Sequence, residues 1–205
     1  MNYLAHIYLS GDDEEIIIGN FIGDFVKGHQ FNQYTQMIRK GIILHRYIDS
    51  FTDTHAIVRR SKARLNEEYH KYSGIIIDIL YDHFLVKNWS SYSDAPLDEF
   101  INKFFNLANR YFDLLPESVK FFLPSFIKNN WIKMYDTVEG IQEVLLRMSS
   151  RTSLPDNTTM GVAVLRRDYE LFEAEFQAYF PALIAYVTKT FGVVLEGVKL
   201  PREAE

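Results

Sequence analysis

Cysteine is absent from this 205-residue sequence. Disulfide bonds, thiolate zinc sites and thiol nucleophiles are therefore excluded, and any bound metal must be held by His, Asp and Glu side chains. A chain without cysteine also fits a reducing compartment such as the cytosol. The absence leaves imidazole and carboxylate chemistry as the kinds of metal site that this sequence can build.

Long apolar runs and an excess of positive charge are missing as well. No stretch reaches the length of a transmembrane helix, and the apolar start of the chain is too short for a signal peptide and lacks its basic region. The net charge of −5 argues against binding to bulk nucleic acid. We expect a soluble, cytoplasmic protein whose partners include neither nucleic acid nor membrane, while its oligomeric state stays open.

The remaining composition favours helices packed around one core. Hydrophobic residues make up 47% of the chain and aromatic residues 15%, which is enough for a sizeable core in one domain. Apolar residues recur at helical spacing, without sustained strand alternation. We predict an all-α, single-domain helical bundle over residues 1–192 and a C-terminal tail over 193–205. Helices are expected near 2–9, 13–28, 33–51, 54–70, 74–88, 96–112, 117–129, 137–150 and 160–191.

Residues of metal-binding type interrupt these apolar helices at four places. A buried carboxylate or imidazole is costly unless it is paired, hydrogen-bonded or bound to a cation. His45 and Asp49 lie one helical turn apart, and so do Asp78 and Asp82, whose like charges repel unless a cation or proton lies between them. One such residue alone is better explained as a satisfied core side chain. Together they indicate a metal site in the bundle core, with candidate residues His6, Asp24, His45, Asp49, Asp82 and His83.

Glycine accompanies these polar residues. Gly19 and Gly23 fall on one stripe with Asn20 and Asp24, and Gly41 lies one turn before His45. A glycine inside a helix costs about 1 kcal/mol relative to alanine. We interpret the glycines as places where a ligand approaches the backbone, against the alternative of a stripe that faces water.

A local basic run stands out in an acidic chain. It could form a basic patch or an ordinary solvated helix face. The run comprises Arg59, Arg60, Lys62 and Arg64, and it is preceded by Arg39, Lys40 and Arg46.

Five segments contain or follow the polar positions: NYLAH at 2–6, GNFIGDFVKG at 19–28, GIILHRYIDSFTD at 41–53, DILYDHFL at 78–85 and VLLRMSSR at 144–151. In these segments the sequence resembles the acyl-carrier-protein phosphodiesterase family. The segments keep the order and spacing of that family, and the resemblance runs from residue 1 to about 190.

The resemblance implies an HD-like, metal-dependent phosphohydrolase with manganese as its metal. Its substrate would be holo acyl carrier protein, an acidic protein, and its products apo carrier protein and 4′-phosphopantetheine. The wider superfamily is named for a His-Asp doublet, whereas this chain has Asp82 followed by His83, which leaves the ligand assignment open. The alternatives are a related hydrolase for a nucleotide or another small phosphodiester, and a helical scaffold without activity.

The family resemblance suggests roles for individual side chains. Asp24 is the candidate catalytic residue, because a carboxylate near an attacking water can orient it and accept its proton. We predict the metal ligands, or the side chains that touch them, among His6, Asp24, His45, Asp49, Asp82 and His83. Lys27, Arg46 and Arg151 are the candidate phosphate contacts, with surface salt bridges as the alternative. The basic run at 59–64 is the candidate surface for an acidic carrier protein.

Overall fold

The computed structural model describes residues 2–150, 154–195 and 197, and in these residues it contains eleven α-helices, six short 3₁₀ helices (η) and no strand. The prediction of an all-α protein is confirmed. The α-helices are α1 Tyr3–Tyr8, α2 Glu14–Phe21, α3 Gln36–Thr54, α4 Ala56–Ala63, α5 Asn66–Tyr69, α6 Ser73–Lys87, α7 Leu97–Arg110, α8 Glu117–Lys128, α9 Val138–Ser149, α10 Thr158–Arg167 and α11 Tyr169–Phe191. The 3₁₀ helices are η1 Gly23–Phe25, η2 Gly28–Gln33, η3 His70–Tyr72, η4 Trp89–Ser91, η5 Phe112–Leu114 and η6 Lys133–Asp136.

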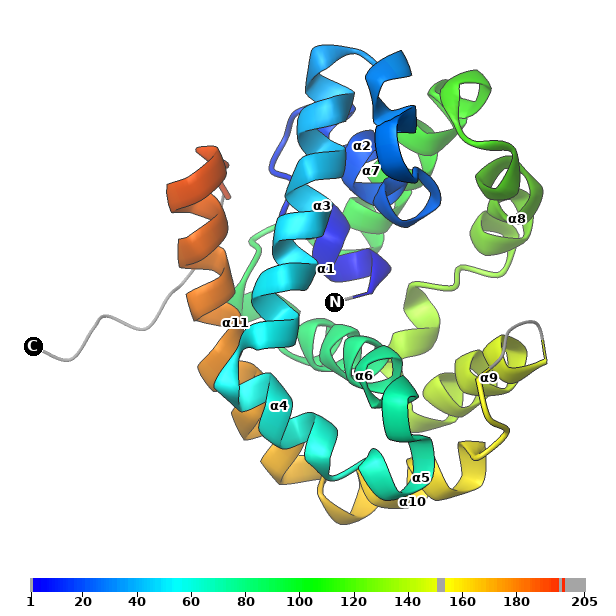
Figure 1. Ribbon diagram of the computed structural model, residues 1–205, viewed down its shortest axis with the longest axis vertical. Coiled ribbons are helices and arrows are strands. Elements are labelled where there is room, and N and C mark those ends of the chain that lie inside the picture. The colour runs from blue at the N-terminus through cyan, green and yellow to red at the C-terminus, as the bar shows by residue number, and fades with distance from the viewer. Residues whose placement is uncertain (1, 151–153, 196, 198–205) are drawn as a thin grey trace, which may run out of the picture.

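The short helix α1 lies in the middle of the molecule (Figure 1). It contacts α2 on one side and α6 on the other, while the longer α3 packs against α2, α4 and α11. The buried apolar side chains of these helices form one continuous core cluster. No helix in the described part of the chain is both long and apolar enough to cross a bilayer.

Two glycines let α2 and α3 pack at very short range. A Cβ on Gly19 would lie 2.0 Å from the carbonyl oxygen of Ile38, and a Cβ on Gly41 would lie 2.3 Å from that of Ile16. Any larger side chain would push the two helices apart. The interpretation that these glycines admit a ligand is therefore wrong, because what approaches the backbone here is the neighbouring helix.

Three of the expected helices are interrupted. The helix expected over 13–28 ends at Phe21, and the chain continues as the separate turns η1 and η2. The helix expected over 54–70 divides into α4 and α5, and the one expected over 160–191 divides at Asp168. After this division α10 packs against α9 and α5, whereas α11 packs against α3, α4 and α6. The interruption after Phe21 matters most, because it moves Asp24 from a helix onto the tight turn η1.

Candidate metal centre

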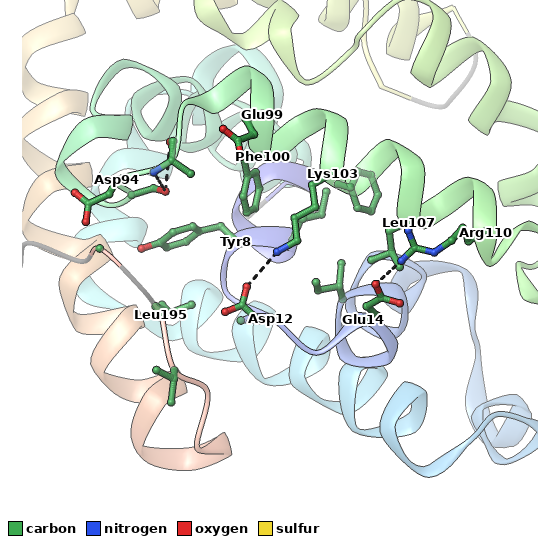
Figure 2. Close-up of a pocket in the computed structure, with 18 residues that line it drawn as sticks. Tyr8, Asp12, Glu14, Asp94, Glu99, Phe100, Lys103, Leu107, Arg110 and Leu195 are labelled. Carbon is green, nitrogen blue, oxygen red and sulfur yellow. Dashed lines mark hydrogen bonds and ion pairs between the residues drawn. The ribbon is translucent and has the colours of Figure 1, made fainter.

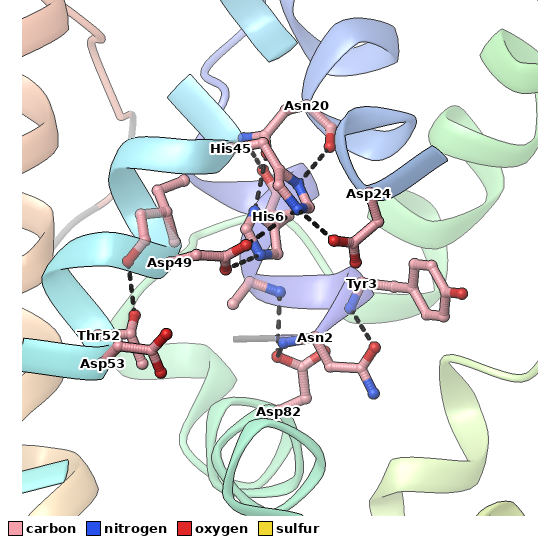
Figure 3. A network of polar contacts seen from close by, with 12 residues as sticks. Asn2, Tyr3, His6, Asn20, Asp24, His45, Asp49, Thr52, Asp53 and Asp82 are labelled. Carbon is pink, nitrogen blue, oxygen red and sulfur yellow. Dashed lines mark hydrogen bonds and ion pairs between the residues drawn. The ribbon is translucent and has the colours of Figure 1, made fainter. Parts of the chain in front are cut away.

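Four polar side chains meet where α1, α3 and η1 come together (Figure 3). His6 comes from α1, Asp24 from η1, and His45 and Asp49 from adjacent turns of α3. The Nε2 atom of His6 lies 3.2 Å from Asp49 Oδ1, and the Nε2 atom of His45 lies 3.1 Å from Asp49 Oδ2 and 3.3 Å from Asp24 Oδ1. We call these four residues the polar centre.

The two imidazoles form the buried side of the polar centre. Their rings stack with centroids 4.0 Å apart and planes inclined by 17°. Both histidines are buried, whereas Asp49 and Asp24 expose 37% and 72% of their side chains. The imidazole rings are therefore covered by protein, and the carboxylates connect their Nε2 atoms to solvent.

Asn20 fixes the orientation and the tautomer of both rings. Its backbone carbonyl oxygen lies 2.8 Å from His45 Nδ1, and because a carbonyl can only accept, this nitrogen carries a proton. Its side-chain oxygen lies 2.8 Å from His6 Nδ1, while its amide nitrogen donates to the His6 carbonyl and to Ser10 Oγ. In the neutral form of each ring, the free lone pair is therefore on Nε2, the atom that faces the carboxylates.

The two Nε2 atoms are the decisive feature of the polar centre. Both are buried, and neither makes a hydrogen bond of normal geometry among the described residues. A buried polar atom without a hydrogen bond is rare in folded proteins and costs free energy. The ligand atoms of His6, His45 and Asp49 all lie within 4.8 Å of one another, so one cation could contact all three.

Without a bound cation, the four side chains of the polar centre have shifted pKa values and differ in their protonation states. Burial and the neighbouring His45 lower the pKa of His6 to about 4. Burial also acts to lower the pKa of His45, but the nearby carboxylates outweigh it and raise that pKa to about 9. Contact with His45 lowers the pKa of Asp24, and contacts with both imidazoles outweigh burial and lower the pKa of Asp49. At neutral pH the polar centre thus holds one charged imidazole, one neutral imidazole and two carboxylates.

The turn that carries Asp24 is held against the His45 ring. A Cβ on Gly23 would lie 2.3 Å from His45 Cγ, so only glycine allows η1 to pass this close. On its other side the turn meets an aromatic wall, in which the ring of Phe122 lies 5.4 Å from that of Phe25 and 6.2 Å from that of Tyr3. Sequence reasoning assigned no such role to Gly23, although a glycine directly before the candidate catalytic residue was a usable signal.

Asp82 lies apart from the polar centre, on the opposite side of the first residues of α1 (Figure 3). Its carboxylate is fully buried and accepts hydrogen bonds from the backbone N–H groups of Leu4, Ala5 and Asn2, at 2.8, 3.3 and 3.2 Å. Burial raises the pKa of Asp82 to about 7, against the lowering effect of these three donors. The expected place among the ligands is thus corrected: Asp82 satisfies the free amides at the N-terminus of α1.

His83 is also placed away from the other candidate ligands. Its Nδ1 donates to the carbonyl oxygen of Tyr135 at 2.6 Å, and its Nε2 lies 2.8 Å from the hydroxyl of Tyr169, which can donate to it. Burial lowers its pKa. Because both ring nitrogens are engaged by the protein's own groups, neither is available to a metal in this arrangement.

The three candidate phosphate contacts have different surroundings. Arg46 is exposed on α3, donates to the carbonyl oxygen of Val26 at 3.1 Å and lies over the ring of Phe31 at 5.3 Å. Lys27 is exposed just after η1. Arg151 lies outside the described residues. The first two therefore stand at the surface near the turn that carries Asp24.

The basic run on α4 is largely neutralised by the protein itself. Arg60 lies 2.9 Å and Arg64 lies 2.6 Å from the carboxylate of Glu175, which is almost fully buried on α11. Lys62 pairs with Asp53 at 2.6 Å. These pairs attach α4 to α11 and α3, so they take up most of the charge that was expected to face an acidic partner.

A cavity of about 550 Å³ lies elsewhere, between α7, the segment that joins α1 to α2, and Val194, Leu195 and Gly197 (Figure 2). Its cations are paired, Lys103 with Asp12 at 3.5 Å and Arg110 with Glu14. No residue of the polar centre lines it. The polar centre and this cavity are thus separate features of the molecule.

The model of the family described as acyl carrier protein phosphodiesterase matches residues 1–183 of this sequence. The chain belongs to the acyl carrier protein phosphodiesterase family. This membership confirms the resemblance seen in the sequence and makes the chain an enzyme of a hydrolase family. It also identifies the segments around the polar centre as part of a shared domain.

Individual relatives agree with the family match. An acyl carrier protein phosphodiesterase of Klebsiella pneumoniae (strain 342) is 31% identical over 192 residues, which cover 90% of this chain and 96% of the relative. The protein of the same name from Escherichia coli (strain K12 / DH10B) is 31% identical over 197 residues, covering 92% and 98%. One from Yersinia enterocolitica is 28% identical over 186 residues, covering 90% and 96%. No solved structure matches the chain.

Proposed function

We propose that this chain is a metal-dependent phosphodiesterase that releases 4′-phosphopantetheine from holo acyl carrier protein and leaves the apo carrier protein. The observation that carries the proposal is the pair of buried Nε2 atoms, on His6 and His45, that face two carboxylates without making hydrogen bonds. The family supplies the substrate, and the absence of cysteine is consistent with work in the reducing cytoplasm.

The donor set fits a divalent cation of the manganese type. His6, His45 and Asp49 would hold it, with Asp24 as a further ligand or a contact to a ligand. Imidazole and carboxylate without thiolate suit Mn²⁺, Fe²⁺, Mg²⁺ or Zn²⁺, and the family resemblance favours manganese. A bound cation would displace the proton that His45 otherwise carries, and would engage the Nε2 lone pairs of both rings, for which the described residues supply no hydrogen-bond donor. When bound, the ion supplies Lewis-acid polarisation of the phosphoryl group and lowers the pKa of water.

Asp24 is suited to accept the proton of the attacking water. Its pKa is lowered by contact with His45, so the group is ionised at neutral pH, and most of its side chain is exposed to solvent and substrate. In the reaction the water oxygen bonds to phosphorus, the bond from phosphorus to the serine oxygen breaks, and the serine oxygen takes up a proton. Proton acceptance by a positioned base contributes about 10²- to 10⁴-fold in rate.

Other residues orient the side chains of the polar centre or would bind the phosphodiester. Asn20 holds both imidazoles with Nε2 toward the carboxylates, and Gly23 lets the turn of Asp24 pass against the His45 ring. Lys27 and Arg46 stand at the surface and would attract the negatively charged phosphodiester. Arg151 is proposed for the same purpose from its sequence segment.

The test is to incubate purified protein and Mn²⁺ with holo acyl carrier protein and to follow the loss of 4′-phosphopantetheine by mass spectrometry. The parent protein should produce apo carrier protein, and Asp24→Asn should lower turnover about 10²- to 10⁴-fold, because the amide cannot accept the proton. Activity of Asp24→Asn within a few-fold of the parent would return Asp24 to a structural role. Hydrolysis of bis(p-nitrophenyl) phosphate without any release from the carrier protein would favour a small phosphodiester as substrate.

A further inference from the structure

A second concave surface lies on the outward side of α3, beside the C-terminal end of α11. Its volume is about 590 Å³, and none of the residues of the polar centre lines it. We call it the α3 groove, and the residues that define it here are Phe31, Met37, Arg39, Lys40, Ile43 and Phe191.

The charge of the α3 groove is opposite to that of the whole chain. Arg39 and Lys40 line it and no acidic side chain does, although the protein carries a net charge of −5. Among the described residues neither cation has an ion pair, in contrast to Arg60 and Arg64, which hold Glu175. The guanidinium of Arg46, stacked over Phe31, adds a third positive charge at the rim.

Exposed apolar side chains accompany these cations. Ile43 is 36% exposed and Tyr47 is 46% exposed, although both lie on a helix that packs into the core through its other face. The ring of Tyr47 lies 5.2 Å from that of Phe191. Aromatic residues and arginine beside exposed aliphatic groups are the composition of protein-binding surfaces more than of ordinary solvated ones.

A continuous exposed strip of α3 joins the groove to the polar centre. At about 100° per residue, Arg46 lies between Ile43 in the groove and Asp49 in the centre, and Ser50 lies beside it. Ile43, Arg46 and Ser50 are all exposed and Asp49 is partly exposed, so the part of the chain that the structure describes leaves this strip open. From Ile43 to Asp49 the helix rises only about 9 Å. A molecule seated in the groove could therefore place a flexible, phosphate-linked group at the carboxylates.

We propose that the α3 groove is the docking surface for the protein part of the substrate, an acidic carrier protein. The inference rests on the proposed function, because that function requires the enzyme to bind an acidic protein while being acidic itself. Complementary charge steers encounter and suppresses repulsion between two proteins of like net charge. The exposed apolar residues of the groove then supply contact area once the partner is seated.

The test compares two double variants with the same change in net charge. Arg39→Glu with Lys40→Glu reverses the groove, whereas Arg59→Glu with Lys87→Glu reverses two exposed cations on other helices that have no ion pair among the described residues. For holo carrier protein at low salt, kcat/KM of the groove variant should fall about tenfold or more below that of the control variant, and the gap should narrow at high salt. Arg39→Gln with Lys40→Gln should lie between them, which guards against a folding defect in the reversed variant.

Each contrary result has a distinct meaning. Equal losses in the groove and control variants would show that only net charge matters, and would overturn the docking site. If kcat/KM of the groove variant for bis(p-nitrophenyl) phosphate falls by the same factor as for the carrier protein, the substitutions have damaged the catalytic reaction itself. That result would also overturn the docking site. A change in self-association, seen by sedimentation and without an effect on the carrier protein, would reassign the groove to a second copy of the chain. If the parent protein releases no phosphopantetheine at all, the proposed function fails before the variants are compared.

Discussion

The polar centre around His45 and the cluster of Asp82 and His83 on α6 contain the same residue types, histidine and aspartate, yet the fold uses them in opposite ways. In the polar centre two buried imidazole nitrogens face carboxylates without hydrogen bonds. In the cluster on α6, Asp82 accepts three backbone hydrogen bonds and both nitrogens of His83 are engaged. Of these two clusters, the one with unsatisfied ring nitrogens is the candidate for a ligand, and the one whose polar atoms are all engaged has a structural role.

The two clusters also cooperate. Asp82 holds the start of α1, and α1 carries His6, whose ring stacks on His45. The position of one proposed metal ligand, His6, therefore depends on a buried carboxylate that lies outside the polar centre. A change at Asp82 should act first on stability and only then on the site, whereas a change at His45 should act on the site directly.

The largest effect is expected at His45. The substitution His45→Gln keeps a side chain of similar size and an N–H group for the Asn20 carbonyl, but removes the imidazole Nε2. Even the loss of a residue that only supports a ligand lowers metal affinity or activity by about 10- to 100-fold, and the loss of a ligand should cost at least as much. Metal content by mass spectrometry and turnover of holo carrier protein should both fall by about 100-fold.

The matched control for this prediction is the same measurement on Asp82→Asn. That variant should retain most of its Mn²⁺ after purification, because Asp82 contacts backbone amides and not the polar centre. Full metal content and full activity in His45→Gln would contradict the assignment of the polar centre as the metal site.

A smaller effect, on stability, is expected at Asp82. The substitution Asp82→Ala leaves the backbone N–H groups of Leu4 and Ala5 buried without an acceptor, and should lower the free energy of unfolding by about 1–3 kcal/mol. Asp82→Asn keeps one acceptor oxygen and should lose less. Urea denaturation of the metal-free proteins measures both values. Unchanged stability in Asp82→Ala, together with loss of bound metal, would instead move Asp82 back among the ligands.

Local pattern in the sequence was sufficient for most of the helices and for part of the polar centre. His45 and Asp49 are one turn apart on a helix of clear period, so their proximity follows from the spacing alone. The interruption after Phe21 was not foreseen, because its cause is tertiary: η1 must turn to lie against the ring of His45, which is 22 positions after Gly23. Helical periodicity reports on one segment and contains no information about such a contact.

For the same reason, the sequence could not predict that the polar centre has free ring nitrogens whereas the cluster on α6 is satisfied by the protein's own groups. Asp82 and its backbone N–H donors, on Leu4 and Ala5, are separated by 78 and 77 positions in the chain. Whether a buried carboxylate meets a cation or the free amides of a helix end depends on which helices pack together. The glycines illustrate this as well. From the sequence alone, Gly19 and Gly41 could allow either a ligand or another helix to approach the backbone, and only the packing of α2 against α3 decides between the two.

The smallest expected effect is the pH dependence of the stability that His83 contributes, which we compare with that of His45. Burial lowers the pKa of His83, so the unfolded chain, with a histidine pKa of about 6.5, binds the proton more readily than the folded protein. The contribution of His83 to stability is therefore full above pH 6.5 and is lost as the pH falls below that value. The pKa of His45 is raised to about 9, so its contribution in the metal-free protein has the opposite sign and is lost as the pH rises through about 9.

Urea denaturation of the metal-free parent and of His83→Gln, at pH 7.5 and at pH 5, isolates the first of these contributions. The parent should lose more stability than the variant on going to pH 5, because only the parent carries a buried neutral imidazole at this position. The difference between the two proteins removes the titration of His45 and of all other groups that they share. If the parent and His83→Gln lose the same stability between pH 7.5 and pH 5, His83 is already charged in the folded protein. It would then resemble His45 and not a buried neutral imidazole.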